Sequence, residues 1–184
     1  MSYRRWILVA AGLFTTGMAF GLVIADKAAY FFAGEITALE ELTRLLNLEP
    51  FTISMAAFIF LKNTSALLFS FIFSPLLCLV PVLALTVNGG LLSFVSVIVI
   101  EQESVGLLLA GLLPHGILEI PALIIGEAAA LSFGMMTIIA LISRKRRGQL
   151  IPNLKQNIKY MALAFALLLP AAIIETYITP IFLG

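Results

Sequence analysis

The chain has 184 residues, of which 61% are hydrophobic and only 11% are charged, and its net charge is +1. Soluble domains average about 25% charged residues, and a soluble domain of this size could not bury so much apolar surface. The mean hydropathy of +1.11 therefore excludes an ordinary soluble protein and predicts a single integral membrane domain over residues 1–184. Such a domain is expected to contact membrane lipids and to bind no nucleic acid.

The first predicted element is an apolar run over residues 6–25, which follows Arg4 and Arg5. A basic start before an apolar run is also typical of a secretory signal peptide. This run is long enough to cross a bilayer, so we interpret it as the first transmembrane helix. Gly17 and Gly21 are four residues apart and would let a second helix approach closely.

Residues 26–50 form the long polar stretch of the chain. Within it, leucines spaced three or four residues apart over 39–48 predict an amphipathic helix. Helices that bind membrane surfaces are usually basic, whereas this one is acidic. We therefore expect an external amphipathic helix that packs on the protein.

The second span is expected over residues 51–73 and is interrupted by a polar sequence that begins with Lys62 and Asn63. A lysine in hydrocarbon needs a partner, because an unpaired ammonium there would lose its proton or reach for water. We predict that Lys62 pairs with an intramembrane acid, first with Glu119 and second with Glu127.

The third span is expected over residues 76–100, with a kink at Pro81 and a break at the sequence Asn-Gly-Gly that starts at Asn88. Two interpretations of the break stand. It is either a tight helix crossing in which Asn88 bonds across the interface, which we favour, or an unwound ligand site. Cys78 is the only cysteine, so no intramolecular disulfide can form, and we expect a buried apolar side chain.

The apolar stretch over residues 105–143 is too long for one simple span at about 1.5 Å rise per residue. Pro114 and Pro121 are expected to divide it. We interpret residues 105–113 as a re-entrant or half-membrane segment and the part from Pro121 as a full span. The last span is expected over residues 158–177, which gives an all-α polytopic transmembrane helical bundle of about five spans.

Charges outside the spans separate by sign when the N-terminus is placed in the cytoplasm and five spans alternate. The cytoplasmic side then holds no acid and receives these basic residues: Arg4, Arg5, Arg144, Lys145, Arg146, Arg147, Lys155 and Lys159. The external side holds two basic residues and these acids: Asp26, Glu35, Glu40, Glu41, Glu49, Glu101 and Glu103. This positive-inside pattern predicts a cell-membrane protein with an external C-terminus.

Several polar residues fall inside the predicted spans, where a charge at the bilayer centre costs about 2.5–3.5 kcal/mol on insertion scales. Together they form the candidate functional or structural polar cluster: Lys62, Asn63, Asn88, His115, Glu119, Glu127 and Glu175.

His115 and Glu119 are four residues apart and share one face of a helix. We favour a buried hydrogen bond between them that holds the helix break. A ligand, proton or ion site is the second interpretation, and catalysis is the third. Glu127 adjoins a row of small residues at Gly126, Ala130 and Gly134, which predicts a helix-packing groove.

Several enzymatic motifs are absent. With one Asp and one His, the chain can form neither a two-aspartate protease site nor the zinc motif H-E-x-x-H. It has no G-x-S-x-G elbow, no P-loop and no dinucleotide-binding glycine loop. The sequence therefore predicts no enzyme, no cofactor and no metal site.

Residues 113–122 read Leu-Pro-His-Gly-Ile-Leu-Glu-Ile-Pro-Ala and lead into the small-residue row. This motif resembles the hallmark of the stage II sporulation protein M family. Weaker similarities are the Asn-Gly-Gly sequence at Asn88 and the Glu-Thr-Tyr-Ile-Thr-Pro sequence at Glu175. The chain departs from the family pattern at Lys62 and at Glu127, which both add charge inside the membrane.

The resemblance implies a non-enzymatic membrane scaffold or assembly component, similar to sporulation proteins that hold peptidoglycan-degrading partners. Further copies of the chain and membrane or extracytoplasmic proteins are the expected partners. The alternative is a small-solute or ion transporter, or one subunit of a permease, which uses His115 and Glu119. A scaffold predicts a sealed interior, whereas a transporter predicts a hydrated cavity that reaches His115.

Overall fold

The computed structural model describes residues 3–23 and 51–183, together with the single positions 37, 41, 44 and 49. Within these residues, five helices are long and apolar enough to cross a membrane, as the sequence predicts. The amphipathic helix predicted over 39–48 lies outside the described residues, apart from two isolated positions.

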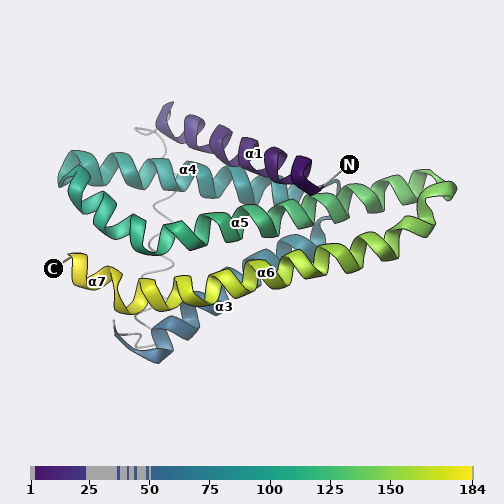
Figure 1. Ribbon diagram of the computed structural model, residues 1–184. Coiled ribbons are helices and arrows are strands. Elements are labelled where there is room, and N and C mark those ends of the chain that lie inside the picture. The colour runs from purple at the N-terminus through teal and green to yellow at the C-terminus, as the bar shows by residue number, and fades with distance from the viewer. Residues whose placement is uncertain are drawn as a thin grey trace.

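The helices follow the chain in this order: α1 (Tyr3–Val23), α3 (Ile53–Phe73), α4 (Leu79–Gln102), α5 (Val105–Ile142), the short 3₁₀ helix η1 (Arg144–Gln149), α6 (Leu150–Tyr177) and α7 (Thr179–Leu183). Figure 1 shows α5 between two layers, with α1 and α4 on one side and α3 and α6 on the other. Two buried clusters match this arrangement, because α5 contributes residues to both. The chain is an all-α helical bundle.

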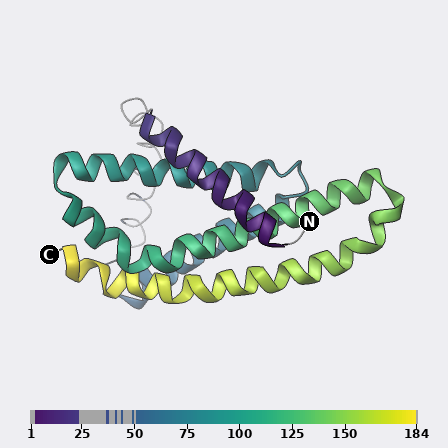
Figure 2. The ribbon, with the colours of Figure 1, turned by 45° about the horizontal axis from the view of Figure 1, so that its top comes forward.

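The five long helices alternate in direction, so that their ends gather in two groups (Figures 1 and 2). The N-terminal end of α1, the turn between α3 and α4, and η1 lie toward one side of the bundle, with η1 extending beyond the other two, and α7 lies on the opposite side. The basic residues 144–147 in η1 therefore lie on the same side as Arg4 and Arg5. This is the grouping that alternating spans require.

The third span begins with a tight turn rather than a kink. Leu77 and Cys78 both have a left-handed backbone, with φ of 54° and 56°. Pro81 follows in the first turn of α4, where its missing N–H removes no intrahelical hydrogen bond. The kink predicted at Pro81 is therefore wrong. The expected burial of Cys78 is confirmed, since its side chain is 6% exposed.

The predicted break at Asn88 is also wrong, because α4 continues through it as a regular helix. The favoured crossing is present instead. A Cβ on Gly89 would overlap the backbone of Phe14, and one on Gly21 would lie 2.5 Å from the carbonyl oxygen of Gly90. Glycines on α1 and α4 thus let the two helix backbones touch.

The prediction that Pro114 and Pro121 divide the stretch over 105–143 into separate segments is wrong, whereas the re-entrant or half-membrane course of residues 105–113 stays a prediction. α5 is one helix of 38 residues that contains both Pro114 and Pro121. Its first third runs at a steep angle to the rest, and the bend is visible in Figure 2. Proline removes a hydrogen bond and bends a helix without ending it. A helix of about 57 Å, at about 1.5 Å per residue, thereby fits beside shorter ones.

The small-residue row on α5 packs as predicted. A Cβ on Gly126 would lie 2.9 Å from Leu67 of α3, and one on Gly134 would overlap the backbone of Ser74. Ala130 between them is fully buried. This row is the surface on which α3 rests.

Candidate functional site

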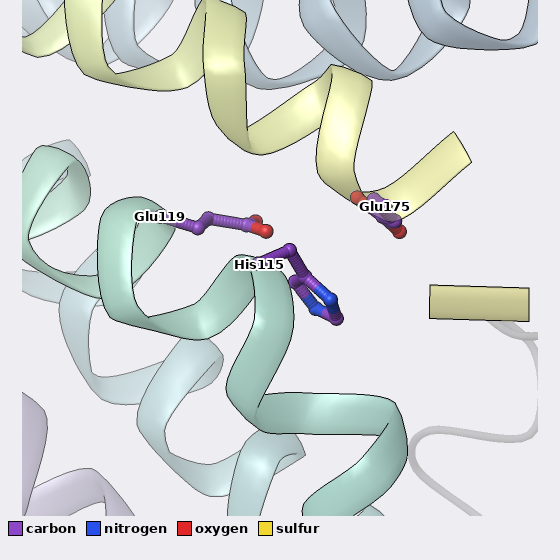
Figure 3. Close-up of side chains that lie close together, drawn as sticks. All are labelled: His115, Glu119 and Glu175. Carbon is purple, nitrogen blue, oxygen red and sulfur yellow. The ribbon is translucent and has the colours of Figure 1, made fainter. Parts of the chain in front are cut away.

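The polar centre of the bundle joins α5 to the end of α6. His115 and Glu119 lie one turn apart on α5, next to its bend, and Glu175 lies in the last turn of α6. One nitrogen of His115 and one carboxylate oxygen from each glutamate lie within 4.8 Å of one another. Figure 3 shows that the two glutamates project toward the space between the helices from opposite sides.

Partners of these groups come from two other helices. Asn63 on α3 donates to Oε1 of Glu119 at 3.1 Å, and Nδ1 of His115 lies 3.3 Å from Oγ1 of Thr179 at the start of α7. The hydroxyl of Thr179 itself points to the carbonyl oxygen of Ile174, at 3.4 Å. In the tautomer with the proton on Nδ1, His115 donates a hydrogen bond to Oγ1 of Thr179, and Nε2 keeps its lone pair.

The structure differs here from two sequence predictions. The predicted His115–Glu119 hydrogen bond is not formed, because His115 turns to Thr179 and Glu119 to Asn63. The predicted pair of Lys62 with Glu119 or Glu127 is also wrong: within residues 51–183, Lys62 forms no ion pair. Its side chain is exposed, although it is close enough to Glu175 to interact electrostatically.

A cavity of about 100 Å³ lies at this cluster. Lys62 and Asn63 line it from α3, and Glu119 and Glu175 line it from α5 and α6. Two carboxylates that approach each other in apolar surroundings repel unless a proton or a cation lies between them. The arrangement can therefore bind a positive charge.

Glu127 has a contact of its own, although it lines one cavity together with Glu119 and Asn63. Its side chain is 1% exposed and accepts a hydrogen bond from Oγ of Ser70 at 2.5 Å. Ser70 is equally buried and lies on α3, so this bond crosses the interface between α3 and α5. Glu127 is therefore a buried contact between helices.

A shallow opening between α3 and α4 exposes part of this polar interior to the side of the bundle. We call it the α3–α4 groove. It is a cavity of about 70 Å³ whose lining includes Asn63 and Ala66 of α3, Ala84 and Asn88 of α4, and Glu119 of α5. Asn88 is exposed and donates to the carbonyl oxygen of Ala84 in its own helix, at 2.7 Å. The sequence analysis favoured a hydrogen bond from Asn88 across a helix interface, and this part of the prediction is wrong.

A second polar region, at the end of the bundle that holds η1, was missed by the sequence analysis. A cavity of about 410 Å³ there is lined by α1, α5 and α6. Asn157 is 1% exposed and donates to Asn153 and to Ser132, while the rings of Tyr3 and Tyr160 stack at 3.3 Å. The spacing of Asn153 and Asn157 by one helical turn was the available signal.

Comparison with known proteins adds a family. The family model described as stage II sporulation protein M matches residues 10–180. An uncharacterised protein of Methanocaldococcus jannaschii is 32% identical over 93 residues, which make up 50% of this chain and 51% of that protein. The chain thus matches only about half the length of this relative. No solved structure matches the chain.

Proposed function

Since the chain belongs to the stage II sporulation protein M family, we propose that this multi-pass membrane protein is a non-enzymatic assembly component, which binds a transmembrane helix of a partner protein along the α3–α4 groove. One observation carries the proposal. Lys62 and Asn88 lie in the middle of apolar helices, yet both side chains are exposed on the side of the bundle.

Such side chains are costly against lipid and useful against protein. An exposed lysine at membrane depth costs about 2.5–3.5 kcal/mol on insertion scales. A partner helix that presents a carboxylate or an amide to Lys62 would remove much of this cost. Ala66 and Ala84 line the groove together with Asn88 and with Asn63, the neighbour of Lys62 in the chain, and small residues let helix backbones approach closely.

The sizes of the cavities favour assembly over solute transport. The two cavities that reach Glu119 measure about 70 and 100 Å³. These spaces are small beside the roughly 300–1,000 Å³ of typical small-molecule pockets. A transporter would need a wider hydrated path past His115, whereas a scaffold needs only its outer surface.

Photo-crosslinking in native membranes tests this proposal. A photoreactive phenylalanine analogue at Ala66 should give a crosslinked product of one defined mass. The same analogue at Phe20, which is 64% exposed on α1, serves as the lipid-facing control and should give none. Replacing Lys62 with Met should reduce the product about tenfold or more, because the partner loses its polar contact.

The result also distinguishes the partners. A product at twice the mass of the chain that carries both tags when two differently tagged copies are expressed together identifies a second copy. Another mass identifies a different protein. Equal crosslinking from Ala66 and Phe20, or a product that is indifferent to Lys62, would refute the groove as a docking site.

We further propose that the end of the bundle holding η1 lies in the cytoplasm, as its basic residues suggest. In a Cys78→Ser background, a cysteine at Glu103 should react with a membrane-impermeant thiol reagent on intact cells. A cysteine at Gly148 should react only after permeabilisation, and it is tolerated because no atom lies within 4 Å of its Cβ. Labelling of the cysteine at position 148 on intact cells would show that the topology is the reverse of the one proposed.

A further inference from the structure

We propose that His115, Glu119 and Glu175 bind one divalent transition-metal ion, for which Zn²⁺ is the representative. The three residues offer one nitrogen and two carboxylate oxygens, which come from two helices and lie within 4.8 Å of one another. The sequence analysis placed all three residues in its candidate polar cluster but predicted no metal site, and the fold is what brings Glu175, 56 residues beyond Glu119, close to the other two. The site shares Glu119 with the lining of the α3–α4 groove, whereas His115 and Glu175 do not line that groove.

Charge is the first argument. Two carboxylates face each other across a small cavity, and the basic residue that lines this cavity is Lys62. Lys62 is exposed and forms no ion pair within the described range 51–183, and its longer-range electrostatic interaction with Glu175 leaves two carboxylates facing one ammonium without a full counter-charge. A divalent cation between Glu119 and Glu175 would supply that charge.

The donor set selects the class of metal. Imidazole nitrogen suits Zn²⁺ and other first-row transition metals, whereas Ca²⁺ and Mg²⁺ prefer oxygen ligands alone. Zinc binds histidine nitrogen and carboxylate oxygen at about 2.0–2.2 Å, which puts the ligand atoms about 3.4 Å apart in a tetrahedron. Binding would therefore draw ligand atoms that now lie within 4.8 Å of one another closer together.

Thr179 supports the same conclusion. Metal-binding histidines usually donate their other N–H to an oxygen, which fixes the tautomer and the ring. Here Nδ1 of His115 lies 3.3 Å from Oγ1 of Thr179, and in the tautomer that carries its proton on Nδ1 the lone pair of Nε2 would be available to an ion. A water molecule would complete a four-coordinate site. Glu175 and Thr179 both lie where α6 ends and α7 begins, so an ion would join this end of the bundle to α5.

Calorimetric titration of the purified full chain with Zn²⁺, after removal of any histidine tag, tests the site. Wild type should bind one Zn²⁺ per chain. Glu175→Gln should weaken binding at least tenfold, and His115→Ala should do the same. Glu103→Gln is the matched control, because it removes an exposed acid outside the cluster and should leave the affinity unchanged.

X-ray absorption at the zinc edge of the wild-type complex gives a readout that does not depend on how well variants fold. It should show nitrogen and oxygen neighbours that include one imidazole, and the imidazole signal should disappear in His115→Ala. Absence of stoichiometric Zn²⁺ in wild type, equal weakening by Glu175→Gln and Glu103→Gln, or a bound ion without imidazole would each overturn the proposal.

Discussion

Gly89→Val is expected to separate α1 from α4 and to lower the melting temperature of the detergent-solubilised protein by about 10 °C or more. The added Cβ would overlap the carbonyl group of Phe14, which belongs to the backbone of α1 and cannot turn away. Overpacking a core costs about 1–3 kcal/mol even when side chains can adjust, and more when a helix must move. For a chain of this size, each kcal/mol corresponds to about 2–4 °C.

Gly12→Val is the matched control for this prediction. Gly12 lies on the same helix α1, and no atom lies within 4 Å of a Cβ placed there. The same change of residue type should therefore leave the melting temperature within about 2 °C of wild type, because exposed substitutions rarely change stability by more than about 0.5 kcal/mol. Similar losses from both variants would mean that valine itself, rather than the crossing, destabilises the helices.

This crossing shows how far the sequence could predict the fold. Gly17 and Gly21 indicated that some helix approaches α1 closely, and Gly89 indicated a helix crossing in the third span. Neither motif predicts which helix packs against it, because small residues at four-residue spacing allow the close approach of any helix of suitable shape. The structure pairs the two motifs with each other: Gly17 meets Thr86 and Gly21 meets Gly90.

The failure at α5 has a different cause. Pro114 and Pro121 were interpreted as helix ends, since proline lacks an N–H and clashes with the preceding turn. In this protein α5 lies between two layers of helices, and from Ile120 onward its residues pack into the buried clusters on both sides. Rules that consider only the local sequence do not include the stabilisation that α5 gains from packing against other helices. The number of long helices was nevertheless predicted correctly.

The polar cluster was predicted in part. The spacing of His115 and Glu119 put them on one face of a helix, which the structure confirms. The error at Lys62 concerns rotation, because successive residues on a helix point about 100° apart at 3.6 residues per turn. α3 turns Asn63 toward Glu119, and its neighbour Lys62 therefore faces outward. Helix rotation depends on packing, which no spacing rule supplies.

Glu127→Ala is expected to destabilise the protein by about 3 kcal/mol, which for this chain length lowers the melting temperature by about 6–12 °C. Glu127 is 1% exposed, so removal of its side chain leaves a cavity between α3 and α5. It also leaves the hydroxyl of Ser70 without the acceptor at 2.5 Å. An unsatisfied buried hydroxyl alone costs about 1–3 kcal/mol.

Glu127→Gln separates the hydrogen bond from the charge. Glutamine has nearly the same volume as glutamate, and its carbonyl oxygen can accept a hydrogen bond from Ser70, so we expect less than about one third of the loss seen with alanine.

Ser70→Ala should cost about 1 kcal/mol, and the double variant Ser70→Ala/Glu127→Ala should cost less than the sum of both, because the two residues share one bond. Thermal unfolding in detergent measures the melting temperatures of the wild type and of these four variants. Strict additivity would show that Ser70 and Glu127 act independently, and a glutamine variant as unstable as the alanine variant would show that the negative charge, rather than the shape and the hydrogen bond, holds α3 against α5.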